Sequence, residues 1–280
     1  MNEKISIVTG ASSGIGLLTA VELAKRGYRV IATMRDPSRR GPLDRAARES
    51  NVAATIDVRR LDVNELSLVP DVMREVLHDY GRVDVLVNNA GFVYAGFAED
   101  LRVDEVRQQL ETNFFGQIAV TQGVLPSMRA RGSGCIIMVS SESGRMGQPG
   151  CSAYCASKFA LEGWSETLRI EMSPLGVKVV LVEPGAFKTD IWERNTRISE
   201  LILNGQSPNQ ERGRRLKEWA VTAKKADPGV VARAIARIAN DPNPRLRYVI
   251  GRDAVTRMML RAVLPWNIYE RLVLKTVGLR

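Results

Sequence analysis

Short apolar runs alternate along the chain with longer segments in which apolar residues recur at helical spacing. The runs predict strands at residues 5–8, 29–33, 59–62, 83–87, 135–139, 177–182 and 246–250. The helical spacing predicts helices that include residues 14–26, 106–131 and 154–171. This alternation predicts an α/β fold with a doubly wound parallel sheet, helices on both faces, and ligands bound at the carboxyl ends of the strands.

A glycine-rich turn joins the first predicted strand to the first predicted helix. Gly10, Gly14 and Gly16 follow the pattern G-x3-G-x-G, which lets the backbone turn sharply and brings bare amides close to a ligand. The helix N-terminus then offers unpaired N–H groups and a partial positive charge to a pyrophosphate. Taken alone, the turn is also compatible with tight packing, with Thr9 and Ser13 serving as helix caps.

Tyr154 and Lys158 form the pattern Y-x3-K within Y-C-A-S-K. A free phenol, with a pKa of about 10, is a poor acid–base catalyst at neutral pH, and a nearby cation lowers that pKa. Positions four apart share one helix face, so we expect Lys158 to lie beside Tyr154. The pair alone is common on exposed helices. Combined with the glycine turn, it indicates a nicotinamide-dependent oxidoreductase.

Together these motifs resemble the short-chain dehydrogenase/reductase family, from Ile5 to about Thr189. Further matches are R-L-D-V with Asp62, N-N-A-G at residues 88–91, T-N-F-F-G with Asn113, V-S-S-E-S-G with Ser141, and Pro184-Gly185 followed by Thr189. The runs F-A-L-E-G and A-T-M-R-D are similar to the hydroxysteroid and retinol dehydrogenase-like branch. The resemblance implies a single-domain Rossmann fold with a seven-stranded parallel sheet.

The resemblance also assigns catalytic roles. The catalytic residues that it implies are Asn113, Ser141, Tyr154 and Lys158. In that scheme Lys158 also bonds the nicotinamide ribose, and Ser141 polarises the substrate oxygen. Asn113 holds a water that links Lys158 to solvent. Read without the family, Ser141 is a turn residue after a strand and Asn113 is an interior amide.

Two other serines lie close to Ser141. We prefer Ser141 to Ser140 because it lies thirteen positions before Tyr154, the usual family interval, and Ser143 is a weaker candidate. The family also places Asp62 against the adenine ring and the P-G-x3-T stretch against the nicotinamide carboxamide. The residues expected to bind the cofactor are Gly10, Ser12, Ser13, Gly14, Ile15, Gly16, Arg35, Asp62, Val63, Asn89, Ala90, Gly91, Tyr154, Lys158, Pro184, Gly185 and Thr189.

The end of the second predicted strand bears on the choice of nucleotide. NAD-binding relatives generally carry an acid there that accepts from both ribose hydroxyls, and this chain has Met34. Arg35 follows, with Arg39 and Arg40 just beyond, and guanidinium groups suit a 2′-phosphate. Asp36 lies where an acid is also expected, but we interpret it as the start of a turn. NADP(H) is therefore favoured over NAD.

Two segments depart from the core pattern. Residues 188–225 form a long polar insertion, where the family builds a lid over the substrate; Glu193, Arg194 and Arg197 are contact candidates, although solvation is favoured for each. Residues 252–280 are apolar at helical spacing, with Pro265 as an interruption. This tail is either an interfacial membrane helix or a flap that packs on the pocket or a partner subunit, and packing is favoured. We expect residues 1–251 to form the catalytic domain.

The composition excludes several classes of protein. The 280 residues are 45% hydrophobic and carry a formal charge of +9, but the basic residues are spread out and no nucleic-acid-binding motif appears. Attraction to anionic substrates, cofactor or membrane surfaces is the milder inference. Cys135, Cys151, Cys155 and the single His78 predict neither a disulfide framework nor a metal site. With M-N-E-K running straight into the first strand and no apolar run of spanning length, we expect a cytoplasmic protein.

The leading hypothesis is an NADPH-dependent carbonyl reductase, or the reverse alcohol dehydrogenase, acting on a hydrophobic ketone, aldehyde or alcohol. One alternative is a non-catalytic NAD(P)-sensing protein, and another is a fatty-acyl ketoreductase. An epimerase or dehydratase of the longer family branch lacks support, because its glycine turn and larger carboxyl-terminal domain are not seen. The family implies a homodimer or homotetramer. The sequence names neither the substrate nor the direction of the reaction.

Overall fold

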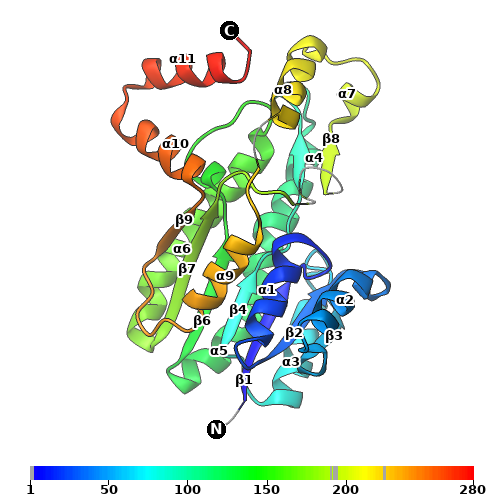
Figure 1. Ribbon diagram of the computed structural model, residues 1–280, viewed down its shortest axis with the longest axis vertical. Helices are drawn as coiled ribbons and strands as arrows, with labels where there is room; N and C mark the ends of the chain where they lie inside the picture. The colour runs from blue at the N-terminus through cyan, green and yellow to red at the C-terminus, as the bar shows by residue number, and fades with distance from the viewer. Residues whose placement is uncertain (1–2, 190, 192–194, 223–224) are drawn as a thin grey trace.

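A seven-stranded parallel sheet forms the centre of the molecule, in the order β3-β2-β1-β4-β6-β7-β9. The computed structural model describes residues 3–189, 191, 195–222 and 225–280 (Figure 1). The strands of the sheet are β1 (Lys4–Thr9), β2 (Tyr28–Met34), β3 (Ile56–Arg60), β4 (Val85–Asn88), β6 (Gly134–Val139), β7 (Val177–Pro184) and β9 (Arg247–Ile250). The predicted doubly wound fold is confirmed.

Helices cover both faces of this sheet. One core lies beneath α1 (Gly14–Ala24), α2 (Gly41–Glu49) and α9 (Gly229–Ile238), and the other beneath α3 (Val69–Tyr80), α5 (Gly116–Arg131) and α6 (Ser152–Met172). Strand β7 shows why both are needed. Val180 and Val182 belong to the first core, whereas Val179 and Leu181 belong to the second. A strand that is apolar on both faces must be buried on both faces.

Strand β3 begins earlier than the predicted range 59–62. It pairs with β2 from Ile56 opposite Val30 to Arg60 opposite Met34. Ile56 and Val58 pack on the core, while the intervening polar side chains point away from it. The predicted range was wrong because the apolar Leu61 lies just beyond the strand, although its N–H still donates to the Met34 carbonyl at 3.0 Å.

The helix predicted over residues 106–131 is continuous but not uniform. It begins as α4 (Val103–Leu110), passes through a π-helical segment, η3 (Glu111–Phe115), and continues as α5. A π segment inserts extra backbone into a helix and is frequent at functional sites. Here it contains Asn113, whose side chain is fully buried.

Additional elements lie beyond the carboxyl ends of the strands, at the upper end of Figure 1. A small parallel sheet pairs β5 (Val93–Ala95) with β8 (Thr196–Ile198). The helices at this end are α7 (Glu200–Leu203), α8 (Gln210–Thr222), α10 (Arg252–Val263) and α11 (Trp266–Thr276). Short 3-10 turns complete the chain: η1 (Pro37–Arg40), η2 (Ala53–Thr55), η4 (Glu142–Gly144) and η5 (Ser173–Leu175).

Candidate active site

A cavity of about 310 Å³ opens at the carboxyl edge of the sheet. Nearly all of the residues expected from the sequence to bind or act on a ligand line it. They are Gly10, Ser12, Ser13, Gly14, Ile15, Arg35, Asp62, Val63, Asn89, Ala90, Gly91, Asn113, Ser141, Tyr154, Lys158, Pro184, Gly185 and Thr189. Gly16 does not line the cavity and is instead buried beneath it.

The glycine turn is closely packed against the end of β4. Gly10 has φ 67°, in the left-handed region that favours glycine. A Cβ on Gly16 would lie 2.4 Å from both the Gly10 carbonyl oxygen and the Asn89 side-chain nitrogen. That nitrogen donates to the Thr9 carbonyl at 2.9 Å and to the Gly10 carbonyl at 3.2 Å. Close packing therefore requires glycine at position 16, and the Asn89 hydrogen bonds fix the backbone of the turn.

Neither alternative helix cap from the sequence is found. Ser13 stands at the N-cap position of α1, and its side chain makes no capping hydrogen bond among the described residues. The Thr9 hydroxyl accepts instead from the backbone N–H groups of Asn89 and Ala90, at 2.9 and 3.0 Å. The first N–H groups of α1 are thus left open toward the cavity, as an anion site at a helix N-terminus requires. This cradle fits the pyrophosphate of a dinucleotide.

Ser141, Tyr154 and Lys158 come together at the sheet's carboxyl edge. Ser141 follows β6, and the other two lie one turn apart on α6. The Lys158 amine donates to the Val139 carbonyl at 2.8 Å and lies 5.8 Å from the centre of the Tyr154 ring. Lys158 is only 4% exposed. The last residue of β6 therefore positions the lysine.

The pKa values in this cluster differ from the sequence expectation. Burial raises the pKa of Tyr154, and the hydrogen bond with Ser141 opposes that rise. Burial also lowers the pKa of Lys158 to about 8, against an opposing effect of Glu162. The net shift of the Tyr154 pKa is upward because desolvation by burial is the largest influence on it, and the lowering effect of Lys158 stays a prediction. Near neutral pH the phenol is protonated and the amine still carries its charge.

Ser141 is also the serine of the three candidates that bonds Tyr154. Its oxygen accepts from the Ser143 N–H at 3.1 Å, which starts the η4 turn and fixes the Ser141 side chain. Ser143 is buried and lies outside the cavity, whereas Ser140 lines it. The geometry therefore favours the same serine as the sequence interval.

Asn113 is held by the protein on both sides of its amide. The side-chain nitrogen donates to the Phe92 carbonyl at 3.1 Å and to the Ser157 hydroxyl at 3.2 Å. The side-chain oxygen accepts from the Phe92 N–H at 3.1 Å. The π segment thus fixes the backbone at Phe92, which lines the cavity next to Gly91. These hydrogen bonds agree with the alternative interpretation of Asn113 as an interior amide.

The far end of the cavity carries guanidinium groups. Arg35 and Arg39 line it, while Arg40 pairs with Asp44 at 2.8 Å. Asp36 accepts from the Ser38 N–H at 3.0 Å and the Ser38 hydroxyl at 2.7 Å, so it caps η1. Those hydrogen bonds lower the pKa of Asp36. The turn-forming role interpreted for Asp36 is thus seen.

Thirteen of the described cavity residues lie outside the set expected to bind the cofactor or to catalyse, although Met34, Asp36, Arg39, Ser140 and Arg197 among them were considered from the sequence. The thirteen are Met34, Asp36, Arg39, Leu61, Asn64, Phe92, Thr112, Val139, Ser140, Phe187, Ile191, Asn195 and Arg197. Phe92 directly follows N-N-A-G and Phe187 lies inside P-G-A-F-K-T, so their motifs offered a signal. Asn195 belongs to no motif, so no sequence signal indicated that it lines the cavity.

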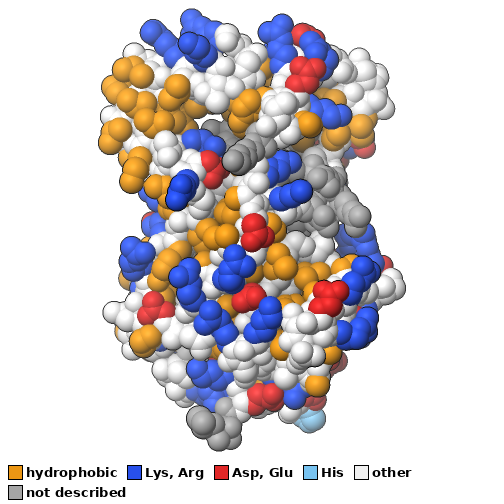
Figure 2. All heavy atoms as spheres, viewed as in Figure 1, with side chains coloured by type: hydrophobic (Ala, Val, Ile, Leu, Met, Phe, Trp, Pro, Cys, Tyr) orange, Lys and Arg blue, Asp and Glu red, His pale blue; other side chains and the backbone are white. Residues whose placement is uncertain are grey.

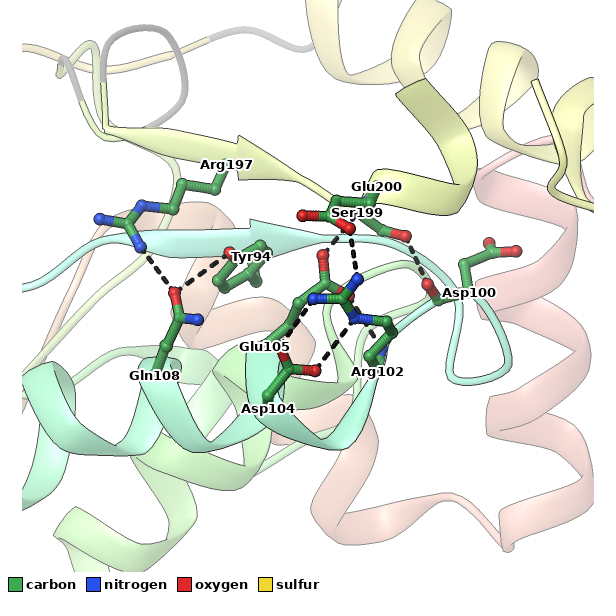
Figure 3. Close-up of polar contacts among 9 residues, drawn as sticks. All are labelled: Tyr94, Asp100, Arg102, Asp104, Glu105, Gln108, Arg197, Ser199 and Glu200. Atoms are coloured by element: carbon green, nitrogen blue, oxygen red, sulfur yellow. Dashed lines mark hydrogen bonds and ion pairs between the residues drawn. The ribbon is translucent and has the colours of Figure 1, made fainter. Parts of the chain in front are cut away.

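Part of the 188–225 segment is bound to α4 by polar contacts (Figure 3). Arg197 donates to Gln108 at 3.0 Å, and its guanidinium lies 4.6 Å from the Phe92 ring centre. The Glu200 N–H donates to Glu105 at 3.1 Å. Arg197 is exposed but contacts the cavity wall, so solvation alone does not describe it. The other two candidates on this segment, Glu193 and Arg194, lie outside the described residues.

A cradle for a pyrophosphate and a buried Ser-Tyr-Lys cluster on a doubly wound sheet define an oxidoreductase site. A family model described as short chain dehydrogenase matches residues 4–199. The chain belongs to the short-chain dehydrogenase family, whose members in this group act on alcohol or keto groups.

Two curated relatives are similar over most of the chain. The uncharacterized oxidoreductase YusZ of Bacillus subtilis is 42% identical over 279 residues, which cover 98% of this chain and 99% of the relative. Human 17-beta-hydroxysteroid dehydrogenase type 1 is 35% identical over 258 residues, which cover 89% of this chain and 77% of the relative. The resemblance to the hydroxysteroid and retinol dehydrogenase-like branch is thus confirmed.

Solved structures share the fold. A short-chain dehydrogenase from Streptomyces avermitilis is 34% identical, with a TM-score of 0.80, and the match covers 97% of this chain and 98% of that chain. ElxO with NADP bound is 25% identical, with a TM-score of 0.75, and the match covers 91% of this chain and 100% of that chain.

Proposed function

We propose that this chain is an NADP(H)-dependent oxidoreductase that interconverts a hydrophobic ketone or aldehyde and the corresponding alcohol. The observation that carries the proposal is the convergence of Ser141, Tyr154 and Lys158 on one cavity whose far end holds Arg35. We assign the catalytic unit to residues 1–251, with 188–225 as the substrate lid and 252–280 as an extension packed on it.

The proposed proton transfer uses the protonated phenol. When bound, the reduced nicotinamide supplies the hydride that the carbonyl carbon accepts. Tyr154 donates its proton to the carbonyl oxygen, and the Ser141 hydroxyl donates a hydrogen bond to the same oxygen. The charged Lys158 stabilises the phenolate that remains. Because burial raises the pKa of Tyr154, the phenol carries the proton that carbonyl reduction consumes. We assign Asn113 to the path that returns this proton from solvent.

The lining of the cavity supports a hydrophobic substrate. Phe92, Phe187 and Ile191 contribute aromatic and aliphatic surface to it. Apolar side chains beside fixed polar groups suit a ligand that combines hydrocarbon with one reactive oxygen. The human relative is named as a hydroxysteroid dehydrogenase, which is consistent with this class of substrate.

The arginines support NADP(H) as the cofactor. Arg35 and Arg39 line the cavity, and Asp36, which follows Arg35, is engaged in capping η1. Guanidinium groups bind a 2′-phosphate through charge-assisted hydrogen bonds. ElxO, a similar structure, was solved with NADP.

Replacing Tyr154 by phenylalanine tests the catalytic assignment. We expect turnover with a panel of hydrophobic ketones to fall by at least about 100-fold, while NADPH binding by fluorescence titration changes little. Tyr80→Phe is the control, because the Tyr80 hydroxyl bonds Asp57 on β3, away from the cavity. Wild-type turnover in Tyr154→Phe would remove the residue from this role. NADPH binding without turnover of any ketone by the wild type would favour the sensing alternative.

Replacing Arg35 by alanine tests the choice of nucleotide. We expect the Kd for NADPH to rise about tenfold to 100-fold, because a charge-assisted hydrogen bond is lost, while the Kd for NADH hardly changes. Arg40→Ala is the matched control, since Arg40 pairs with Asp44 and does not line the cavity. Equal effects of Arg35→Ala on both nucleotides would contradict the proposal.

We also propose that the protein forms a homodimer or homotetramer and works in the cytoplasm. Phe115, the residue before α5, presents an exposed apolar side chain, and so do Phe159 and Ile170 on α6. Such a surface suits a contact between copies. Light scattering of the purified chain measures the mass, and a monomer at micromolar concentration would contradict this proposal.

A further inference from the structure

The carboxyl-terminal helices α10 and α11 stand apart from the sheet at the upper end of the molecule (Figure 1). Few of their side chains are buried: Ala254 on α10, Tyr269 on α11 and Val277 after it. The Tyr269 hydroxyl reaches the Met146 sulfur at 3.2 Å. These contacts attach the pair to the body but leave its outer surface uncovered.

That outer surface is apolar. Met259 is 64% exposed and Val263 is 75% exposed, both on α10. On α11, Trp266, Ile268 and Leu272 are 57%, 48% and 41% exposed. Figure 2 shows apolar side chains gathered over these two helices. A contiguous apolar surface of this kind on a soluble molecule marks an interaction site.

Basic side chains border the same surface. Residues 252–280 contain six Lys and Arg against two Asp and Glu. Arg257 is engaged in ion pairs with Glu142 and Asp253, but Arg271 and Lys275 form no ion pair with any described residue. In Figure 2 blue side chains lie above the apolar surface at the upper edge of the molecule. Tryptophan, present here as Trp266, and arginine are side chains that prefer the headgroup boundary of a lipid bilayer.

We infer that α10 and α11 dock on the surface of an anionic lipid bilayer. The apolar side chains would enter the headgroup boundary, and the unpaired cations would meet the lipid phosphates. The pair lies in the interface and does not cross it: within the described part of the chain, no helix is long and apolar enough to span a membrane. The inference does not depend on the proposed chemistry.

A second copy of the chain fits this surface less well. A two-fold contact would place the same patch of each copy face to face. Each copy would bring six cations and two acids to the contact, and one of those acids, Asp253, already pairs with Arg257, so like charges would predominate and repel. A bilayer that contains phosphatidylglycerol offers the opposite charge.

Helix α10 also forms hydrogen bonds with residues next to the cavity. Arg257 donates to Glu142 at 2.9 Å in the turn that follows Ser141. Asp253 accepts from the Ala186 N–H at 3.1 Å, next to the cavity residue Phe187. Docking by α10 and α11 would therefore hold the cavity close to the lipid surface, where hydrophobic substrates dissolve.

Vesicle flotation with a matched pair of variants tests the inference. Leu272→Glu and Leu175→Glu make the same chemical change at leucines that are 41% and 42% exposed. Leu175 ends η5 just before the amino end of β7, whereas α10 follows the carboxyl end of β9, so the two leucines lie at opposite ends of the strands. Binding is measured to vesicles of equal phosphatidylglycerol and phosphatidylcholine, and to phosphatidylcholine alone. Circular dichroism checks that each variant is folded.

We expect the wild type and Leu175→Glu to bind the anionic vesicles alike, and Leu272→Glu to bind at least about tenfold more weakly. Binding to neutral vesicles should be weaker still, and added salt should reduce binding to the anionic ones. Failure of the wild type to bind, or equal binding by the two variants, overturns the inference. A change of mass by light scattering in Leu272→Glu, without vesicle binding by the wild type, would instead assign the surface to a contact between copies.

Discussion

The burial of Lys158 has a cost in stability that can be measured. Burial lowers its pKa from 10.5 to about 8. At about 1.4 kcal/mol per pKa unit, keeping this amine charged in the folded protein costs about 3 kcal/mol below pH 8. Lys158→Met removes that cost but leaves the Val139 carbonyl without its donor, a loss of about 1 kcal/mol. We expect the variant to be inactive and yet more stable by about 2 kcal/mol at pH 7.

The pH dependence separates this effect from a general change in packing. Below pH 8 the amine is charged in both the folded and the unfolded protein, so the full cost is present. Between pH 8 and 10.5 the folded protein gives up its proton before the unfolded protein does, and the wild type gains stability relative to the variant. At pH 10 less than about 1 kcal/mol of the cost remains, so the advantage of Lys158→Met should disappear.

Calorimetry at pH 7 and pH 10 measures both differences. For a chain of this size, about 2 kcal/mol corresponds to a rise in Tm of about 6 °C at pH 7. Lys25→Met is the control, because Lys25 is 44% exposed and its pairing with Glu22 is at the surface. A variant less stable than the wild type at pH 7, or a difference that is the same at both pH values, would refute the reasoning.

Two further predictions concern buried positions. Gly16→Ala should raise the Kd for NADPH at least about tenfold and destabilise the fold by about 1–3 kcal/mol, because the new Cβ would lie 2.4 Å from the Gly10 carbonyl. Gly163→Ala, with no atom within 4 Å of a Cβ, should do neither. Burial and Glu162 raise the pKa of Glu183 to about 7, so wild-type stability in urea should fall by up to about 3 kcal/mol from pH 5 to pH 8. Glu183→Gln should not show this decline; parallel curves for the two proteins would contradict it.

Local patterns in the sequence predicted the parts of the site that depend on one element and its neighbours. Gly10 and Gly16 belong to one turn, and Tyr154 and Lys158 share one helix face, so their spacing indicated their relation. The order of the strands came from the family resemblance. Strand β3 was misplaced by a few residues because its bounds depend on pairing with β2.

The sequence by itself determined the doubly wound fold and 18 of the described residues that line the cavity, because alternating apolar patterns and short motifs are local properties of the chain. Only the tertiary structure decided how those residues behave. The raised pKa of Tyr154 and the lowered pKa of Lys158 come from burial, which the whole fold creates. The contact of Arg197 with Phe92 and the uncovered surface of α11 likewise arise where distant segments do or do not meet.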